Sequence, residues 1–398
     1  MAARSGPPWH SAAFRGLWCA SLASAGAQGM ERTTTAWLVV AAGGGPLAVG
    51  LALAARSLPS LLLGLPAGTL ADRADRRRQL LVVAGAAALV MAAVGGILQA
   101  RAISPWQVTG IAFAAGCLQV FDTPARQALV LDTVAAEAAQ RALALNALAV
   151  RLAVALGAVA AGALIVGVGL PRCYLAVAAA YCASAALLLS LRVPRHARVA
   201  GPPPGFGRGL REAARLLVAD PAVRTLSVVG ITCEILAFSY GSALPIIAHD
   251  VLRAGAEGLG TLNAAAAIGG TIAVLLVSLI PDRVRREALL GSVFVLYGLS
   301  LLALSAARSL ALAAAVLVVT GLCAGAFDLL QQTLLQLAVP PDRRGRAVGI
   351  WVLGVGSAPA GNIEMGLLGS ALGAPGALAI NGTLTVLAAA ALLAQVPR

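Results

Sequence analysis

The stretch Gly64-Leu-Pro-Ala-Gly68-Thr-Leu-Ala-Asp72-Arg73-Ala-Asp75-Arg76-Arg77-Arg78 decides the fold of this chain. It begins at the end of an apolar, glycine-spaced run and turns into a dense group of charges before a second apolar run starts at Leu80. A loop this short and basic between two membrane helices is typical of the cytoplasmic side. A shorter version, Leu279-Ile-Pro-Asp282-Arg283-Val-Arg285-Arg286, lies 210 residues later when Asp72 is aligned with Asp282. Because 210 is about half of the 398 residues, we expect an internal duplication.

The composition is that of an integral membrane protein. Residues of the set AVILMFWYC make up 60% of the chain and charged residues only 11%, whereas a soluble domain is about half apolar and about a quarter charged. Apolar runs of roughly 20 residues recur, and each can cross a hydrocarbon core of about 30 Å as a helix. We therefore predict an all-α membrane protein with twelve transmembrane helices. The predicted spans lie near residues 16–42, 47–71, 79–99, 104–121, 143–165, 171–191, 223–247, 258–280, 288–307, 310–337, 346–370 and 375–396.

All 29 basic residues are arginines, and their distribution indicates the orientation. If both termini are placed inside, 22 arginines fall in cytoplasmic segments and only 4, Arg101, Arg172, Arg253 and Arg308, in outer loops. A bias of this kind sets the orientation of membrane helices. The net charge of +13 is therefore a topology signal, helped by anionic lipid of the inner leaflet, and we expect no nucleic-acid partner.

The chain is predicted to divide into two halves joined by a linker. The N-terminal half covers residues 1–191 and the C-terminal half residues 222–398. The linker, residues 192–221, contains Gly201-Pro-Pro-Pro-Gly205, which cannot form a regular helix. Later in the linker, Leu210-Arg211-Glu212-Ala-Ala-Arg215-Leu216-Leu217 has the pattern of a short amphipathic helix on the inner membrane surface.

The first span carries a polar stripe on an otherwise apolar helix. At 100° per residue, five side chains fall within about 80° of one another: Ser21, Ser24, Gln28, Glu31 and Thr35. We expect this stripe to face a wet cavity or a partner helix. Glu31 is its most informative member, because ionisable residues at membrane depth are costly and usually functional. The alternative is a static pair between Glu31 and Arg32.

Further ionisable residues lie inside predicted spans. Arg56 either binds an anionic group in a cavity or pairs with a carboxylate such as Glu31. One of four acids is expected to bind and release a proton, because a desolvated carboxylate has a raised affinity for one; for each acid alone, a static contact is the alternative. The candidates for the substrate and proton pathway are Gln28, Glu31, Arg32, Arg56, Arg151, Glu234, Asp328 and Glu364.

Small residues mark two further spans. Gly157 and Gly162 in the fifth span are expected to let neighbouring helices approach closely. In the eleventh span, Gly354, Gly356 and Pro359 favour a kink or local flexibility.

The charged loop after the second span is expected to act as a conformational latch. Asp72 can accept hydrogen bonds from the N-terminus of a neighbouring helix while the arginines bind nearby carboxylates, and such contacts hold one half against the other. The alternative is a solvated anchoring loop. Phe121-Asp122 and Phe327-Asp328 repeat at an offset of 206, which supports the duplication. The predicted latch residues are Gly68, Asp72, Arg73, Arg77, Arg78, Asp122, Arg126, Asp282 and Arg283.

No enzyme signature competes with a membrane function. The chain has no Gly-x-x-x-x-Gly-Lys-Ser/Thr loop, so we expect no built-in ATP hydrolysis. Its three histidines, His10, His196 and His249, are not paired at ligand spacing and its six cysteines are scattered. We therefore expect neither a metal site nor a cofactor.

Over essentially its whole length the chain resembles the major facilitator superfamily. The signature loop matches at Gly68, Asp72, Arg73, Arg77 and Arg78 and departs at Asp75, where the general pattern has glycine. The branch that contains the enterobactin exporters is similar in its Asp-Arg-x-Asp-Arg-Arg form and at Pro46-Leu-Ala-Val-Gly50, Asp122-Thr-Pro-Ala-Arg126, Leu145-Asn146, Arg151 and Arg344-Gly-Arg346. The resemblance implies two pseudo-symmetric six-helix bundles around a central cavity and alternating access by rocking.

The resemblance also implies a proton-driven exporter of an amphipathic organic compound, a siderophore or a drug-like metabolite. We expect it in the inner membrane as a monomer, with both termini cytoplasmic and with a small-molecule substrate, protons and the lipid bilayer as partners. The fourth span lacks the arginine usual in proton-coupled drug antiporters, and Gly157-Ala158 replaces the family's Gly-Pro pair. Coupling by another acid and uniport therefore stay open, as do import of a small nutrient or lipid and a non-transporting receptor.

Overall fold

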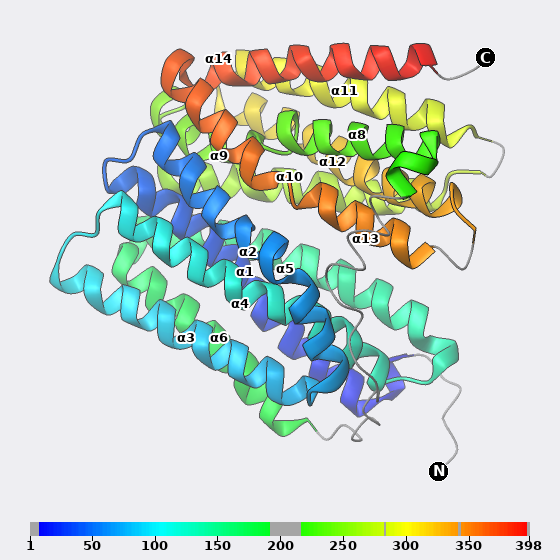
Figure 1. Ribbon diagram of the computed structural model, residues 1–398. Coiled ribbons are helices and arrows are strands. Elements are labelled where there is room, and N and C mark those ends of the chain that lie inside the picture. The colour runs from blue at the N-terminus through cyan, green and yellow to red at the C-terminus, as the bar shows by residue number, and fades with distance from the viewer. Residues whose placement is uncertain (1–7, 192–215, 282–283, 341–343, 396–398) are drawn as a thin grey trace.

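The computed structural model describes residues 8–191, 216–281, 284–340 and 344–395, and these ranges are helical over most of their length (Figure 1). The predicted linker between residues 192 and 215 and the predicted latch residues Asp282 and Arg283 lie outside the described residues. The side chain of Asp72 also lies outside them, although its backbone belongs to a described helix.

Within the described ranges, the N-terminal half folds into six long helices, as predicted. They are α1 (Ala12–Ala41), α2 (Pro46–Arg73), α3 (Arg76–Ala100), α4 (Pro105–Asp132), α5 (Ala139–Val168) and α6 (Leu170–Ser190), with 3-10 turns η1 (Pro8–His10) and η2 (Ala136–Ala138). The fourth helix is longer than its predicted span, because Pro124 is accommodated inside α4. Proline is tolerated in membrane helices where neighbouring groups satisfy the freed backbone.

In the described part of the C-terminal half, the seventh and the eleventh predicted spans are each interrupted. The elements of this half are α8 (Pro221–Leu236), α9 (Tyr240–Ile246), the π-helical turn η3 (Ile247–Val251), α10 (Gly255–Ser278), α11 (Arg286–Ala306), α12 (Leu310–Leu337), α13 (Arg344–Val355) and α14 (Ala358–Gln395). The predicted seventh span is thus divided between α8 and α9. The predicted break in the eleventh span is confirmed, because α13 ends at Val355 and α14 begins at Ala358.

The predicted eleventh and twelfth spans meet inside α14. Gly373 has φ 73° and ψ 161° there, a conformation that glycine adopts without the steric penalty of a Cβ atom. The two parts of α14 run in opposite directions on either side of this residue (Figure 1). Gly373 therefore separates the helix of the predicted eleventh span from that of the predicted twelfth.

Nine stretches of the described chain are long and apolar enough to cross a membrane. The last of them, Gly349–Leu392, includes the turn at Gly373. Two further helices, α1 with 30 residues and α4 with 28, are also long enough to cross. The arrangement of the described residues is therefore consistent with the twelve predicted spans.

Helix starts coincide with the capping residues and prolines of the sequence. The side chain of Ser11 accepts a hydrogen bond from the N–H of Phe14 at the start of α1, and that of Asp75 accepts one from Arg78 at the start of α3. Pro46 begins α2, where its missing N–H has no intrahelical partner to lose. Local sequence thus determines where these helices begin, whereas their apolar surfaces determine how the helices pack.

Equivalent helix pairs pack within each half and between the two halves. In the N-terminal half α1 packs on α5, α2 on α4 and α3 on α6, while in the C-terminal half α10 packs on α12 and α11 on α14. Between the halves, α2 packs on α14 and α5 on α10. The N-terminal half lies below the C-terminal half in Figure 1. This symmetric interface agrees with the internal duplication expected from the sequence.

Small residues allow α1 and α5 to approach closely. A Cβ atom on Gly157 would overlap the carbonyl oxygen of Gly26, and one on Gly29 would overlap that of Val154. Gly162 packs across the interface instead, where a Cβ atom would lie 2.8 Å from the carbonyl oxygen of Ala256 on α10. The predicted packing role of both glycines of α5 is confirmed.

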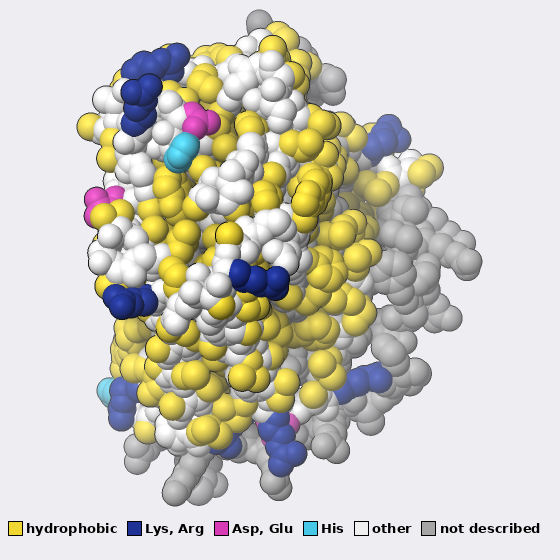
Figure 2. Space-filling view, turned by 90° about the vertical axis from the view of Figure 1, so that its left-hand side faces the viewer, with side chains coloured by type: hydrophobic (Ala, Val, Ile, Leu, Met, Phe, Trp, Pro, Cys, Tyr) yellow, Lys and Arg dark blue, Asp and Glu magenta, His cyan; other side chains and the backbone are white. Residues whose placement is uncertain are grey.

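The outer surface is apolar, as lipid contact requires. Large apolar side chains such as Val82, Leu89 and Leu156 are about 70% exposed, at 71%, 73% and 70% respectively. On the face shown in Figure 2, hydrophobic and uncharged side chains cover most of the surface and charged side chains are few. A soluble monomer rarely exposes apolar area on this scale, so the surface indicates a membrane location.

Candidate functional site

A cavity of about 630 Å³ lies between the two halves, about midway along the helices. The N-terminal half contributes residues of α1, α2, α4 and α5 to its wall, and the C-terminal half contributes residues of α9, α10, α12 and α14. Pockets for small organic molecules are typically about 300–1,000 Å³. The cavity is therefore the candidate substrate site.

The N-terminal wall of the cavity carries three predicted candidates, Arg32 on α1, Arg56 on α2 and Arg151 on α5. The side chain of Arg32 is exposed, that of Arg151 is half-buried and that of Arg56 is 12% exposed. Only Arg56 of the three makes an ion pair with a described residue. Arg32 and Arg151 have neither an ion pair nor a hydrogen bond within the described ranges.

Glu31 pairs with Arg56 and not with its neighbour Arg32. The Arg56 guanidinium donates to both carboxylate oxygens of Glu31, at 2.6 and 2.7 Å, and Glu31 is 1% exposed. Thr35 donates to the same carboxylate at 3.3 Å and is 3.1 Å from the hydroxyl of Tyr174 on α6. Of the two alternatives for Arg56, the structure shows the pairing with Glu31.

The polar stripe of α1 faces partner helices within the N-terminal half. Ser21 accepts a hydrogen bond from Arg126 of α4 at 3.4 Å, and Gln28 donates to Ser24 at 3.4 Å. All five stripe residues are buried. Gln28 lines a second, much smaller cavity of about 20 Å³ together with Gln119, Asp122 and Tyr181, a volume that suits about one water molecule.

The C-terminal wall is mostly small and apolar, with two aromatic side chains and one acid. Phe238 and Tyr240 lie at the junction of α8 and α9, and Asp328 lies on α12. Asp328 accepts a hydrogen bond from the indole N–H of Trp351 on α13 at 3.2 Å. It is the acidic residue of this wall within the described part of the chain, so the structure places this predicted candidate at the cavity.

The other two predicted acids of the C-terminal half lie outside the cavity wall. Glu364 on α14 accepts a hydrogen bond from Asn381 at 3.0 Å, which is a contact inside the C-terminal half. Glu234 on α8 is half-buried and is not among the residues that line the cavity. The sequence alone did not show that Asp328 lines the cavity while Glu234 and Glu364 do not.

Hydrogen bonds and apolar contacts close the cavity on one side. We call the end of the molecule where α1 begins and α14 ends the terminal end, and the end that carries the α1–α2 turn at residues 42–45 the distal end (Figure 1). On the distal side, the N–H of Leu47 donates to Ser370 at 3.2 Å and Asn263 donates to Thr33 at 3.3 Å, both across the halves. The ring of Trp37 lies 5.7 Å from that of His249.

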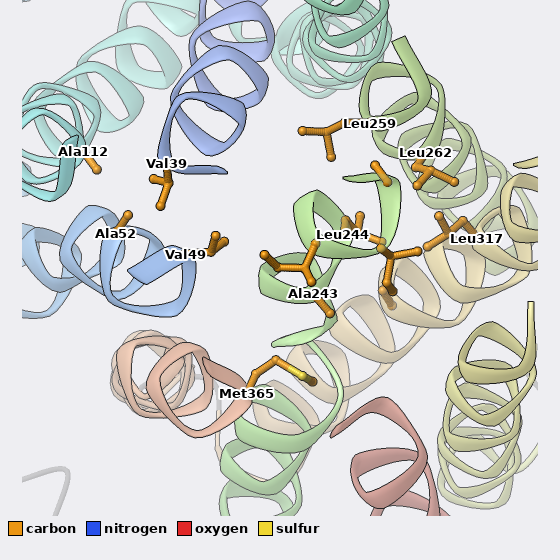
Figure 3. Packing of buried hydrophobic residues seen from close by; sticks show 14 of the residues in the cluster. Val39, Val49, Ala52, Ala112, Ala243, Leu244, Leu259, Leu262, Leu317 and Met365 are labelled. Atoms are coloured by element: carbon orange, nitrogen blue, oxygen red, sulfur yellow. The ribbon is translucent and has the colours of Figure 1, made fainter. Parts of the chain in front are cut away.

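Buried apolar side chains reinforce this distal closure. In Figure 3, Val39 and Val49 of the N-terminal half lie across from Leu244 and Leu259 of the C-terminal half, with Met365 of α14 nearby. On the terminal side of the cavity, Leu61 of α2 reaches the break between α13 and α14, since a Cβ atom on Gly356 would lie 2.7 Å from its Cδ1 atom.

The described contacts of the predicted latch hold the N-terminal half together. Arg77 donates to the carbonyl oxygens of Leu188 and Leu189 on α6, at 2.7 and 2.5 Å, and Arg78 lies 3.8 Å from Asp75 at the surface. Gly68 has open space around it. A latch between the halves therefore stays a prediction for these residues.

Asp122 and Arg126, also predicted latch residues, form a buried pair within α4. The guanidinium of Arg126 donates to the two Asp122 oxygens at 2.6 and 2.9 Å, and both side chains are almost fully buried. A sequence spacing of four residues puts them on the same face of the helix. Their described contacts lie inside the N-terminal half.

The sequence reasoning missed several residues that the structure brings to these sites. Arg76 binds Asp132 at 2.7 and 2.8 Å and so ties the start of α3 to the end of α4. Asn263 and Asn362 line the cavity, and Asn362 accepts a hydrogen bond from Ser242 at 2.6 Å. Both asparagines are amides inside apolar spans, which is a signal that could have identified them.

Two characterised relatives match most of the chain. It is 24% identical over 356 residues to the staphyloferrin A transporter of Staphylococcus aureus (strain NCTC 8325 / PS 47), with 88% of each chain covered. It is 26% identical over 369 residues to the multidrug efflux pump Tap of Mycolicibacterium fortuitum, with 89% of this chain and 88% of that protein covered.

Solved structures show the same fold at lower identity. The nucleoside transporter NupG superposes with a TM-score of 0.72 at 14% identity, covering 96% of this chain and 98% of that one. A bacterial homologue of the human lysosomal transporter Spinster, in an inward-facing and occupied conformation, gives 0.72 at 16% identity, covering 98% and 96%. The model of the family described as transmembrane secretion effector matches residues 4–398. The chain therefore belongs to this family of major facilitator superfamily transporters.

Proposed function

We propose that this protein exports an amphipathic organic compound, a siderophore or a drug-like metabolite, by proton-driven alternating access. The observation that carries the proposal is the cavity shared by the two halves, which is closed on its distal side. Secondary transporters of this architecture bind their substrate midway through the membrane between two repeats that rock about the site. The names of the two relatives, a siderophore transporter and a drug efflux pump, support the substrate class.

The arginine bias supports a location in the inner or plasma membrane with the terminal end in the cytoplasm. Of the 29 arginines, 22 fall on the side that carries the termini, in keeping with the positive-inside rule. In that orientation the contacts of the distal side, such as that of Leu47 with Ser370, face outward.

Asp328 is our candidate for the proton-binding acid. It lies in the cavity wall, where it can exchange a proton with water that enters with the substrate, and its described hydrogen bond comes from the neutral indole of Trp351. Glu31 is instead held by Arg56, and Glu364, which accepts a hydrogen bond from Asn381, lies outside the cavity wall. An acid with a neutral donor can be protonated without leaving a buried arginine unpaired.

Transport into energised inside-out vesicles tests this function. A catecholate siderophore and a lipophilic cation are supplied separately to the parent protein, to Asp328→Asn and to Glu257→Gln, which removes an exposed acid at the start of α10. Export predicts accumulation that a protonophore abolishes, with loss in Asp328→Asn alone. Uptake only into right-side-out vesicles would establish import, and binding without flux under any gradient would establish a receptor.

A further inference from the structure

We propose that the cavity binds its substrate as an organic anion, whose acidic groups contact Arg32 and Arg151 while its apolar part lies against Phe238 and Tyr240. This inference rests on the proposed transport function and specifies the substrate class of the same cavity. It also predicts the orientation of the substrate, with its charge on the N-terminal half and its apolar body on the C-terminal half.

The described wall of the cavity carries more positive than negative side chains. Three guanidinium groups reach this wall, and Glu31 neutralises one of them through the pair with Arg56. Asp328 is attracted to Arg151, yet no nitrogen of Arg151 lies within 4.0 Å of its carboxylate in the described structure. Among the residues that the structure describes, Arg32 and Arg151 thus have no hydrogen-bonded or ion-paired partner. Charged side chains at membrane depth are normally paired, so a ligand anion would supply what the protein itself does not.

The side chains of Arg32 and Arg151 are accessible from the cavity. Arg32 is exposed although it lies near the middle of α1, so its guanidinium opens into the cavity. Arg151 reaches across the cavity, because its Nη1 atom would lie 3.5 Å from a Cβ atom on Gly270 of α10. Small residues of the opposite wall leave room around it. A guanidinium with free N–H groups offers the planar fork that binds a carboxylate through two hydrogen bonds.

The two walls of the cavity differ in charge and in polarity. All three arginines belong to the N-terminal half, and the described lining of the C-terminal half contains no basic residue. Apart from Asn263, Asn362 and Asp328, that lining consists of alanine and glycine together with Phe238, Tyr240, Leu259 and Pro245. Apolar and aromatic surface of this kind favours an uncharged hydrocarbon or aromatic body. The two walls are therefore complementary to the two parts of one amphipathic anion.

The negative charge of Asp328 opposes the binding of an anion in the cavity. Asp328 is the negative group on the wall that faces Arg151, so it attracts Arg151 and repels an incoming anion. Replacing Asp328 by asparagine removes that repulsion while the amide keeps a similar volume. The substitution should therefore tighten the binding of an anion, in contrast to its expected effect on proton-driven flux.

Equilibrium binding to the purified full chain in lipid nanodiscs tests the proposal. The probes share one fluorophore: dansylglycine is an anion, dansylglycinamide is neutral and dansylcadaverine is a cation. The variants Arg32→Gln and Arg151→Gln are compared with Arg172→Gln, which removes an exposed arginine at the start of α6. Arg32→Lys and Arg151→Lys keep the charge without the planar fork and serve as folded substitutes if a glutamine variant does not fold.

We expect the parent protein to prefer dansylglycine over the other two probes. Each glutamine variant should weaken dansylglycine binding at least tenfold, in line with the strength of hydrogen bonds to charged groups, and should leave dansylcadaverine unchanged or bound more tightly. Lysine variants should fall between these limits, Asp328→Asn should bind dansylglycine several-fold more tightly, and Arg172→Gln should match the parent.

Two results would overturn the anion site. One is a parent protein that prefers dansylcadaverine, and the other is dansylglycine binding that neither the glutamine nor the lysine variants weaken. Failure of the transport proposal is a separate outcome. If dansylglycine binds through both arginines but vesicles show no flux, the anion site stands and the exporter function falls. If a siderophore is transported equally well after both arginines are replaced, the exporter function stands and the anion site falls.

Discussion

The ion pair between Glu31 and Arg56 gives the N-terminal half a buried electrostatic contact next to the cavity. Either single neutral substitution, Glu31→Gln or Arg56→Gln, leaves an uncompensated charge in a poorly solvated site. Removing one partner of a buried pair typically destabilises a protein by about 3–5 kcal/mol, whereas removing both is far milder. We therefore expect the double variant to unfold at a higher temperature than either single variant in thermal melts of the detergent-solubilised protein.

A double-mutant cycle with the surface pair Asp75 and Arg78 provides the control. Those side chains are 42% and 80% exposed and lie 3.8 Å apart, so their coupling should be under about 1 kcal/mol. Equal coupling energies for the two pairs would show that the buried Glu31–Arg56 pair contributes no more to the free energy of unfolding than the surface pair does. A double Glu31 and Arg56 variant that is less stable than both singles would contradict the pairing itself.

Single residues also show where sequence reasoning stops. The sequence identified the arginines at membrane depth, because charges are rare in apolar spans, but it left two partners open for Glu31. Arg32 is adjacent in sequence, yet neighbouring residues of a helix point about 100° apart. Arg56 is 25 positions away and meets Glu31 only when α1 and α2 have packed. Pairing of this kind depends on the rotation of each helix, which periodicity alone does not fix.

At the scale of elements, the contact between α1 and α5 depends on glycine. A side chain at Gly157 would overlap the backbone of Gly26, whereas Gly167 on the same helix has open space around it. We expect Gly157→Leu to destabilise the protein by about 1–3 kcal/mol or more, because overpacking forces the helices apart. Gly167→Leu should leave the thermal unfolding temperature close to that of the parent. Equal melting temperatures for the two variants would refute the close packing of α1 on α5.

Helix bounds were predicted better than helix continuity. The spans of α2, α3, α5 and α6 follow from apolar length and from capping residues, which are local properties of the sequence. No comparable local pattern in the sequence predicted the division of the seventh span between α8 and α9. Pro245, the proline of this region, lies inside α9 and not at the break between residues 237 and 239. The break lies beside the cavity, where neighbouring helices can satisfy irregular backbone.

At the scale of the whole molecule, the two halves meet through a symmetric pair of contacts, α2 with α14 and α5 with α10. The internal duplication was visible in the sequence as two matches near one offset, and the twofold relation of these contacts follows from it. The side on which the cavity is closed was not visible in the sequence, because the proposed alternating access requires the same sequence to close either side in turn. Distal closure is a property of this conformation and depends on contacts such as that of Leu47 with Ser370.

The final prediction concerns this distal closure. In a cysteine-free background, the pair Leu47→Cys and Ser370→Cys can be cross-linked with a short bifunctional thiol reagent, because the backbone N–H of Leu47 donates to the Ser370 hydroxyl at 3.2 Å and so brings the two residues together. The cross-link holds the distal side closed, so we expect it to stop flux in vesicles while probes still bind from the terminal side. Either single variant should transport normally after treatment with the same reagent. Full flux through a completely cross-linked protein would mean that the distal side never opens, and alternating access between these two halves would be ruled out.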